Sequence, residues 1–315
     1  MTRRGRELKS MNNQMPIGII GVGLMGSMFA ERLIAAGFGV LGYDIVAEKN
    51  ERLRALGGVA ASSGADVARR CDVIIIMVFN TDQVEDVVEN DILQAVGRNS
   101  GKIVLCSSTV DPDRIAALGE SASQRGLRFL ETPVSGTSQQ CREGLGVGLI
   151  GGDPALMAEV KAVLDTLYPR MFHIGGFGDG GRAKLAINLI LGINRTALAE
   201  GLVFAERLGL DPAKFLDVAK TSAAYSRVMD GKGPKMVRGD FSPEGHMVIS
   251  LKDATLMREQ GRTVGQELPL LETYRSLLQA CIDQGQGELD NSSVIMEIRR
   301  RGTAKTDQQR RSKRA

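Results

Sequence analysis

Three glycines near the start of the chain have the spacing needed to hold a phosphate group. Gly21, Gly23 and Gly26 form a GxGxxG pattern between an apolar run over 16–22 and a segment with helical spacing over 24–36. In such a turn the first glycine permits a tight bend, the second lets the backbone approach a pyrophosphate, and the third lets the helix pack close to the strand. The N–H groups at the start of the helix then face the phosphates. The alternative is a glycine-rich turn of another α/β fold.

An acidic residue follows at the distance expected for the ribose of a dinucleotide. Asp44 ends a second apolar run over 40–43, 21 residues after the second glycine, and its carboxylate can accept hydrogen bonds from both ribose hydroxyls. The same carboxylate would repel a 2′-phosphate, and Ile45 beside it offers no positive charge. NAD is therefore favoured over NADP, although Lys49 and Arg52 lie near enough in sequence to keep NADP possible.

The elements that must position these residues alternate between strands and helices. Apolar runs over 73–78 and 102–106 predict buried strands, and the segments 47–56 and 112–124 predict helices. Another strand is expected over 128–130. Alternation of this kind predicts a parallel sheet with right-handed crossovers.

The second half of the chain lacks strand signals. After about Gly181, residues 184–208 predict one long helix, and Asp211 and Pro212 have the types expected for the N-cap and first residue of the next helix. The long helix is apolar on several sides, so we expect it to be buried between domains or subunits. Length and composition agree with two globular domains, because 315 residues with 43% hydrophobic side chains can bury two cores.

The positive charge of the chain is confined to its two ends. The net charge is +3 over residues 1–14 and +7 over 299–315, which leaves −7 for 15–298 out of a total of +3. A nucleic-acid-binding body would be basic, so the count gives no support for one. Both end segments, a leader over 1–14 and a tail over 299–315, are polar and are expected to be disordered.

Four segments carry a pattern that is found in one enzyme family. They are GVGLMGSMFAERLIAAG (21–37), TPVSGTSQQCREG (132–144), GDGGRAKLAIN (178–188) and LKDATL (251–256). In this order and at this spacing they resemble the β-hydroxyacid dehydrogenase family, which includes 3-hydroxyisobutyrate dehydrogenase and the tartronate semialdehyde and glyoxylate/succinic semialdehyde reductases. The resemblance implies an α/β Rossmann-like domain over 15–177 and an all-helical domain over 178–298, joined by a long helix, with the active site in the cleft between them. It also implies a homodimer or homotetramer.

The resemblance makes Lys184 the catalytic lysine. An ammonium group stabilises the negative charge that develops on a reduced carbonyl oxygen and donates the proton, and burial in a cleft shifts a lysine toward the neutral form that takes the proton back. Asn188 lies four residues on and shares a helix face with Lys184. By the resemblance Asn188 binds substrate. From the residues alone, both could be ordinary residues of a helix surface.

A loop after the strand at 128–130 is expected to hold the acid group of the substrate. Ser135, Gly136 and Thr137 offer hydroxyl and backbone N–H groups to a carboxylate, and the resemblance assigns them to substrate binding. The family more often has glycine where this chain has Thr137. The implied substrate is therefore a small hydroxy acid or semialdehyde that carries a carboxylate.

The remaining expected site residues contact the cofactor. Thr109 and Asn80 follow predicted strands at the ligand edge of the sheet, although Thr109 could instead cap the next helix. The resemblance brings Lys252 to the cofactor from the helical domain, and Asp253 is expected to bond backbone groups nearby. The full set expected to bind cofactor is Gly21, Gly23, Leu24, Met25, Gly26, Asp44, Val78, Asn80, Thr109 and Lys252.

Several other classes of protein do not fit the sequence. The two histidines and four cysteines show no metal-ligand spacing, so no metal site is expected, and the unpaired cysteines indicate reduced thiols in the cytoplasm. No run of 18 apolar residues predicts a transmembrane helix.

Two alternatives to the dehydrogenase remain. An imine reductase has a related architecture, but such enzymes usually lack the lysine that Lys184 supplies here. A catalytically inactive dinucleotide-binding module is the other, and Lys184, Asn188 and Ser135 argue against it.

Overall fold

The computed structural model describes residues 16–302, which fall into two compact units. The first unit ends at Lys184 and the second begins at Leu185, so the division lies inside a single helix. The domain boundary expected between 177 and 178 stays a prediction.

The first unit is built on one mixed β-sheet. Its order is β3-β2-β1-β4-β5-β6-β8-β7, and β9 pairs with β8. The strands are β1 (Ile17–Ile20), β2 (Val40–Tyr43), β3 (Val59–Ala60), β4 (Val73–Ile76), β5 (Ile103–Cys106), β6 (Arg128–Glu131), β7 (Val134–Ser135), β8 (Val147–Gly152) and β9 (Arg170–Gly175). The neighbouring strands from β3 to β6 in the sheet order pair in parallel, as expected. The strands made of consecutive apolar residues, such as β4 and β5, are buried on both faces of the sheet.

The expectation of a parallel sheet is wrong beyond β6. Strand β8 runs antiparallel to both β6 and β7, whereas β9 is parallel to β8. The chain reverses after β6 through a short bend and a helix, and then returns along the same edge. Strands β7 and β8 are consecutive in the chain and adjacent in the sheet, joined by a reversal through α8, and neighbours joined without a crossover pair antiparallel.

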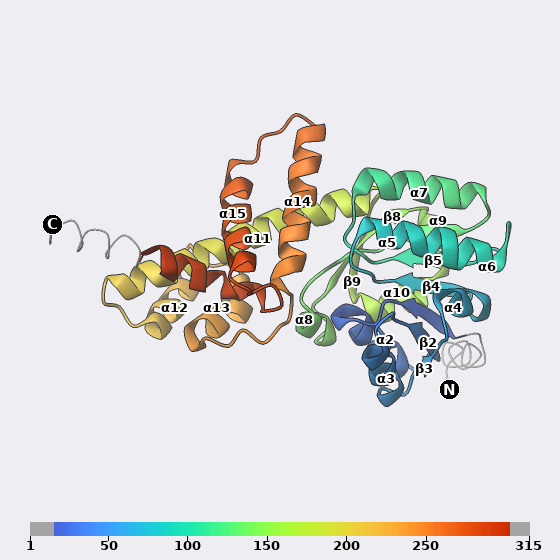
Figure 1. Cartoon of the computed structure of the whole chain (residues 1–315), viewed down its shortest axis with the longest axis horizontal. Coiled ribbons are helices and arrows are strands. Elements are labelled where there is room, and N and C mark those ends of the chain that lie inside the picture. Colours follow the sequence, from blue (N-terminus) through green and yellow to red (C-terminus); the bar gives the residue numbers. More distant parts are fainter. Residues whose placement is uncertain (1–15, 303–315) are drawn as a thin grey trace. The chain divides into compact units, whose positions relative to one another are not determined.

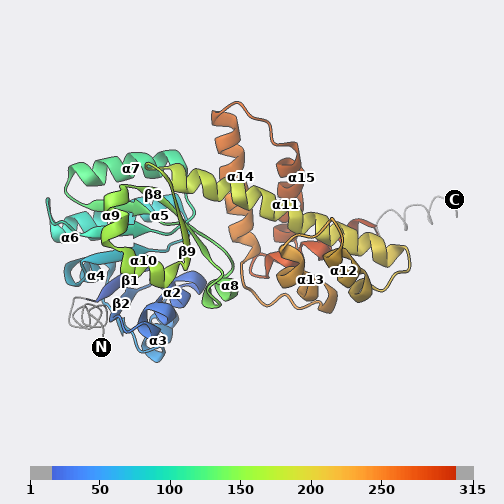
Figure 2. The ribbon, with the colours of Figure 1, turned by 180° about the vertical axis from the view of Figure 1, so that it is seen from behind.

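Helices cover both faces of this sheet (Figures 1 and 2). Helices α4, α5 and α7 lie on one face, and α2, α9 and α10 lie on the other. The helical elements of the unit are α2 (Leu24–Ala35), α3 (Ala47–Ala55), α4 (Gly64–Arg70), α5 (Thr81–Asp86), the π-helical η1 (Val87–Leu93), α6 (Gln94–Val96), α7 (Pro112–Gln124), α8 (Ser138–Arg142), α9 (Pro154–Glu159) and α10 (Lys161–Leu167).

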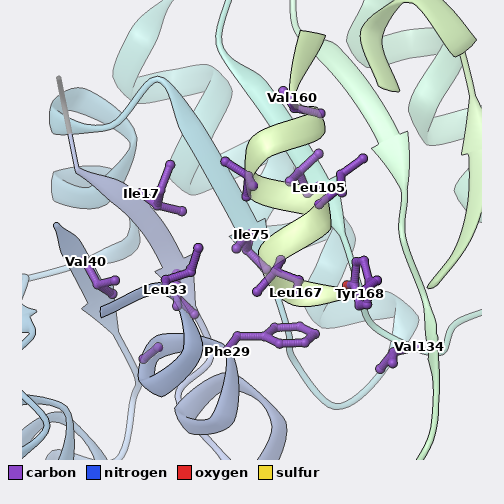
Figure 3. Packing of buried hydrophobic residues seen from close by; sticks show 14 of the residues in the cluster. Ile17, Phe29, Leu33, Val40, Ile75, Leu105, Val134, Val160, Leu167 and Tyr168 are labelled. Atoms are coloured by element: carbon purple, nitrogen blue, oxygen red, sulfur yellow. The ribbon is translucent and has the colours of Figure 1, made fainter. Parts of the chain in front are cut away.

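The core beneath α2 and α10 holds an aromatic pair that fixes the two helices to the sheet (Figure 3). Phe29 and Tyr168 are fully buried and meet edge to face, with ring centroids 5.7 Å apart. The Tyr168 hydroxyl donates to the carbonyl oxygen of Thr132 (2.9 Å) and lies 3.0 Å from the Ser107 hydroxyl. The pair therefore buries a large apolar area, and the phenol oxygen of Tyr168 keeps its hydrogen-bond partners inside the core.

The second unit is helical. Its elements are the long helix α11 (Asp179–Arg207), which starts in the first unit, α12 (Pro212–Thr221), α13 (Val228–Arg238), α14 (Met247–Thr263), α15 (Pro269–Asp283) and the 3-10 turn η2 (Asn291–Ser293). Helices α14 and α15 lie side by side in both views (Figures 1 and 2). Asp211 caps α12 as expected, because its Oδ1 accepts from the Lys214 N–H at 2.8 Å.

Helix α11 begins at Asp179, five residues before the predicted start. In the described part of the chain, it is the one helix whose length and mean hydropathy match a membrane span. However, it supplies Leu198, Ala199 and Leu202 to the core of the second unit. One face of α11 therefore belongs to this core, but only 33% of its most apolar window is buried, so the expected burial of the whole helix is not seen within residues 16–302 of this chain.

The basic tail begins later than the sequence indicated. Residues 294–302 are helical, so the expectation of disorder is wrong for 299–302. Arg299 pairs with Glu206 of α11, and Arg301 donates to Glu297 at 2.7 Å, one turn earlier. These acidic partners hold the arginines in the helix. The remainder of the predicted tail, 303–315, and the predicted leader, 1–14, lie outside the described residues.

Candidate active site

The parallel strands of the first unit end together at one edge of the sheet. Ile20 is in register with Tyr43 and Ile76, Ile76 with Cys106, and Cys106 with Glu131. The segments that follow these strands therefore start side by side. They contain every site residue that the sequence predicted in this unit before Lys184. Ligands of open α/β sheets bind at this edge.

The glycine loop after β1 has the geometry that a pyrophosphate requires. Gly21 has φ +94°, and a Cβ there would lie 2.2 Å from the carbonyl oxygen of Met77. A Cβ at Gly26 would lie 2.0 Å from the carbonyl oxygen of Gly21. A Cβ at Gly23, in contrast, would meet nothing within 4 Å. Because Gly23 is also the N-cap of α2 and no side chain caps that helix, the first N–H groups remain available to an anion, and the loop fits a dinucleotide.

Two predicted cofactor residues form the first turn of α2. Leu24 and Met25 are half-buried and follow Gly23 directly, so they flank the start of the helix that carries these N–H groups.

Asp44 lies at the end of β2, as predicted, but its carboxylate already has partners. The residue is 7% exposed. Its Oδ2 accepts from the Val22 N–H of the glycine loop at 2.8 Å, and its Oδ1 accepts from the Val46 N–H at 3.0 Å. Lys49 places its ammonium 3.3 Å from Oδ1. Asp44 thus fixes the glycine loop to β2 and is paired with a cation that a 2′-phosphate could also attract.

The edges of β4 and β5 are tied together by a serine that the sequence analysis missed. The Val78 N–H donates to the Ser108 hydroxyl at 2.8 Å. Asn80 caps α5, because its Oδ1 accepts from the Gln83 N–H at 2.9 Å. Thr109 is half-buried between β5 and α7. The alternative that Thr109 caps α7 is wrong, since Asp111 accepts the N–H groups at the start of that helix.

The loop over 135–137 lies at the end of β7. Gly136 has φ +148°, and a Cβ there would lie 3.1 Å from the Cys141 Sγ. Thr137 is the N-cap of α8 in a capping box: its Oγ1 accepts from the Gln140 N–H at 3.2 Å, and the Gln140 side chain accepts from the Thr137 N–H at 3.0 Å. The hydroxyl hydrogen of Thr137 takes no part in that cap. Ser135 and Thr137 are both half-buried, so the loop is ordered and still accessible.

Lys184 lies within electrostatic range of Cys141, the residue of α8 that Gly136 of this loop approaches. It is 7% exposed and lies in the second turn of α11. Its charge acts on the Cys141 thiol of α8: burial raises the pKa of that thiol to about 11, and Lys184 acts to lower it. A buried lysine whose charge reaches the segment after this loop is a candidate to exchange a proton with a ligand held there.

The predicted residues of the second unit are joined by Asp253. The Asn188 Nδ2 donates to Asp253 Oδ2 at 2.9 Å, and the Lys252 ammonium lies 3.0 Å from Asp253 Oδ1. The expectation that Asp253 bonds backbone groups is therefore wrong, because it links the side chains of α11 and α14. Asp253 takes an N–H of the Asn188 amide, whereas the amide oxygen, which can only accept, is buried and has no hydrogen-bond partner among the described residues.

Glu131 is the residue at this edge that the sequence analysis did not single out. It ends β6, is 2% exposed and accepts hydrogen bonds at the start of α11. A glutamate directly after the apolar pair Phe129 and Leu130 of a strand is the signal that could have found it. Within residues 16–302, no three His, Cys, Asp or Glu side chains gather where they could hold a metal ion.

Two family models match almost the whole of the described chain. Residues 16–175 match the NAD binding domain of 6-phosphogluconate dehydrogenase, and residues 178–298 match the NAD-binding domain of NADP-dependent 3-hydroxyisobutyrate dehydrogenase. The two matches cover the sheet unit and the helical unit in turn.

Characterised relatives resemble the chain over nearly its full length. L-threonate dehydrogenase of Cupriavidus necator is 31% identical over 89% of this chain and 94% of the relative. The 2-hydroxy-3-oxopropionate reductase of Escherichia coli is 30% identical over 90% and 97%. The crystal structure of 3-hydroxyisobutyrate dehydrogenase from Salmonella typhimurium superposes with a TM-score of 0.82 at 27% identity, over 90% of this chain and 99% of that one. These matches and the geometry of the glycine loop lead to one conclusion: the chain belongs to the β-hydroxyacid dehydrogenase family of NAD(P)-dependent oxidoreductases.

Proposed function

We propose that the enzyme interconverts a small β-hydroxy acid and its semialdehyde, with Lys184 as the general acid and base. The observation that carries this proposal is the burial of Lys184 within electrostatic range of Cys141, whose thiol lies against Gly136 of the 135–137 loop. The dinucleotide supplies the hydride or accepts it. All other chemistry falls to side chains of this enzyme.

The 135–137 loop would hold the carboxylate of the substrate. The Ser135 hydroxyl and the hydroxyl hydrogen of Thr137 can each donate a hydrogen bond to a carboxylate oxygen. Gly136 keeps a side chain out of the space above the Cys141 thiol. A carboxylate fixed at this loop leaves the adjacent carbon atoms of the substrate near Lys184.

Lys184 would then move the proton of the reacting oxygen. In the reductive direction its ammonium donates a proton to the oxygen as negative charge develops there, and in the oxidative direction the neutral amine removes the hydroxyl proton. Asn188, one turn further along α11, presents its amide oxygen and can accept a hydrogen bond from the substrate hydroxyl. Thr109, Val78 and Asn80 would line the cofactor at the ends of β4 and β5.

A panel of substrates tests the proposal directly. Hydroxyisobutyrate, tartronate semialdehyde, succinic semialdehyde and L-threonate are assayed with NAD(H) and NADP(H), in the wild type and in Lys184→Ala. We expect turnover of at least one of these acids and a loss of kcat of about 10²- to 10⁴-fold in Lys184→Ala, with dinucleotide affinity nearly intact. Lys161→Ala removes an exposed lysine of the same unit and is the matched control.

Each other outcome would point to a different function. Near-normal turnover by Lys184→Ala would refute the role of this lysine. Reduction of a cyclic imine without turnover of any hydroxy acid would favour an imine reductase. Dinucleotide binding without turnover of any substrate would favour an inactive binding module.

We also propose that the enzyme is a homo-oligomer in the cytoplasm. Phe204 on α11, Leu208 just after α11 and Val218 on α12 are each more than 60% exposed, which is a large apolar exposure for one helical unit. A second copy of the chain would bury them. Light scattering after size-exclusion chromatography should give the mass of a dimer or tetramer, and Phe204→Glu should lower it. The four cysteines are free and buried, which suits a reducing compartment.

A further inference from the structure

The start of α11 is held by a buried carboxylate from a distant part of the first unit. Glu131 accepts from the Gly178 N–H through Oε1 and from the Gly181 N–H through Oε2, the latter at 3.0 Å. Both hydrogen bonds are buried, and Glu131 itself is 2% exposed. Each carboxylate oxygen thus satisfies one of the N–H groups that a helix leaves without a partner at its first turn.

The glycines of this turn let the helix rest against the sheet. A Cβ at Gly180 would lie 2.7 Å from the carbonyl oxygen of Leu149 in β8, and a Cβ at Gly181 would lie 3.3 Å from Glu131 Oε2. A side chain at Gly180 would force the helix away from the strand, whereas one at Gly181 would require a shift of only a few tenths of an ångström at the carboxylate. Contact with β8 and with Glu131 of β6 therefore accounts for Gly180 and Gly181, whereas Gly178 is required by its φ of +90° and by the carbonyl oxygen of Pro112.

The carboxylate is retained although its burial is unfavourable. Burial raises the pKa of Glu131 above its usual value and outweighs the N–H groups of Gly178 and Gly181 and the charge of Arg182, which act to lower it. The partial positive charge at the start of a 29-residue helix also favours an anion at this place. Arg182 adds a second anchor at the surface, where it pairs with Asp113 of α7 at 2.7 Å.

Glu131 stands at the junction of the two segments that the proposed reaction uses. Its own chain continues through Thr132 and Pro133 into the 135–137 loop. The helix that its side chain holds carries Lys184, which lies three residues after Gly181 and so shares its face of α11. Glu131 therefore connects the 135–137 loop, which is proposed to bind the substrate carboxylate, to helix α11, which carries Lys184.

We propose that Glu131 is a positioning residue, whose bidentate cap on α11 sets the place of Lys184 relative to the 135–137 loop. The inference rests on the proposed function of Lys184. It predicts that a loss of the cap leaves the dinucleotide site intact and slows the chemical step, because a displacement of about 1 Å between reacting groups costs on the order of 10²-fold in rate.

Glu131→Gln tests this link with almost no change of shape. The amide oxygen can replace one acceptor, but the amide NH₂ then faces the other glycine N–H, and two donors oppose each other. We expect the single-turnover rate of hydride transfer, followed by NAD(P)H absorbance, to fall roughly 10- to 100-fold. The dissociation constant of the dinucleotide should stay within about twofold, because the glycine loop and Asp44 are untouched. The primary deuterium isotope effect on kcat should rise as chemistry limits turnover.

Glu159→Gln is the matched control, because Glu159 pairs with Arg128 at the other end of β6 and lies on the surface. It should keep the wild-type rate. If Glu131→Gln does not yield folded protein, Gly181→Ala tests the same contact, since it retains the carboxylate and brings a Cβ against Oε2. A smaller fall in hydride transfer is then expected, because the carboxylate needs to shift by only a few tenths of an ångström.

Lys184→Ala in the same series separates this inference from the proposed function. A wild-type rate in Lys184→Ala would refute the proposed function itself. If Lys184→Ala is impaired but Glu131→Gln, or Gly181→Ala in its place, transfers hydride at the wild-type rate, the positioning role is refuted. Equal weakening of hydride transfer and dinucleotide binding would also refute it, because it would show a general loss of structure.

Discussion

Replacing Lys49 by methionine should make the enzyme more selective for NAD over NADP. Lys49 lies 3.3 Å from Asp44 Oδ1 with 40% of its side chain exposed, so it neutralises part of the carboxylate charge and could approach a 2′-phosphate. Substitution of Asp44 itself is a poorer test, because it would also remove the acceptor of the Val22 N–H that holds the glycine loop.

The size of the effect follows from the charges at the end of β2. Two like charges about 4 Å apart repel by about 4 kcal/mol at an effective dielectric constant of about 20, and screening by solvent and by Lys49 reduces this to about 1–3 kcal/mol. The wild type should therefore prefer NAD by about 5- to 150-fold in kcat/KM. Removing the lysine unmasks Asp44 and deletes a cation near the phosphate. A further change of about 1 kcal/mol, or about fivefold, is expected.

Steady-state kinetics with both cofactors at saturating substrate measure this ratio. Lys214→Met, which removes an exposed lysine of α12, is the matched control and should leave the ratio unchanged. A wild type that prefers NADP would show that the repulsion by Asp44 is overcome. If Lys49→Met leaves the ratio of kcat/KM for NAD to that for NADP unchanged, or lowers it, the role assigned to Lys49 is refuted.

Two further predictions concern the fold and the loop. Gly23→Ala should keep the melting temperature within about 2 °C but weaken NAD(P)H binding at least tenfold, because its Cβ meets only the space for the ligand. Gly26→Ala should lose both NAD(P)H binding and several kcal/mol of stability, because its Cβ would lie 2.0 Å from a backbone oxygen. Equal stability of the two variants would contradict this prediction. Asp290 should stabilise the second unit above about pH 4. Its burial acts to raise its pKa, but the charge of Lys232 and several hydrogen bonds outweigh that effect and hold the pKa at about 2. A contribution of roughly 2 kcal/mol to the free energy of unfolding should then disappear as the pH falls from about 4 to 2. The difference in urea midpoint between the wild type and Asp290→Asn should therefore be smaller at pH 3 than at neutral pH. A difference that does not change with pH would argue against this role of Asp290.

The parts of the fold that depend on local pattern were predictable. The β-branched run of β4, the glycine loop and the spacing to Asp44 each follow from neighbours in sequence, and the structure confirms the Rossmann-like unit and the helical unit. The antiparallel strands β7 and β8 were missed because they are short or rich in glycine, and so carry little apolar pattern.

The start of α11 could not be read from its own residues. Gly178, Gly180 and Gly181 are poor helix formers, and they indicated a loop. The first turn is nevertheless helical because the carboxylate of Glu131, about 50 residues earlier in the chain, takes its free N–H groups. Interactions of this range leave no trace in a window of sequence. The same limit applies to Asp253, whose partner Asn188 lies 65 residues away.

The three glycines of the phosphate loop differ in whether folding or dinucleotide binding requires them, and this difference can be used to interpret the sequence of a relative whose activity is unknown. Gly21 and Gly26 are required by the backbone that surrounds them, so a descendant that no longer binds a dinucleotide would still have to keep both in order to fold. Gly23 faces open space and is required only by a ligand. Selection on the fold alone would let Gly23 drift first. A pseudoenzyme of this lineage should therefore be recognisable by a larger residue at this single position, in a motif that otherwise remains intact.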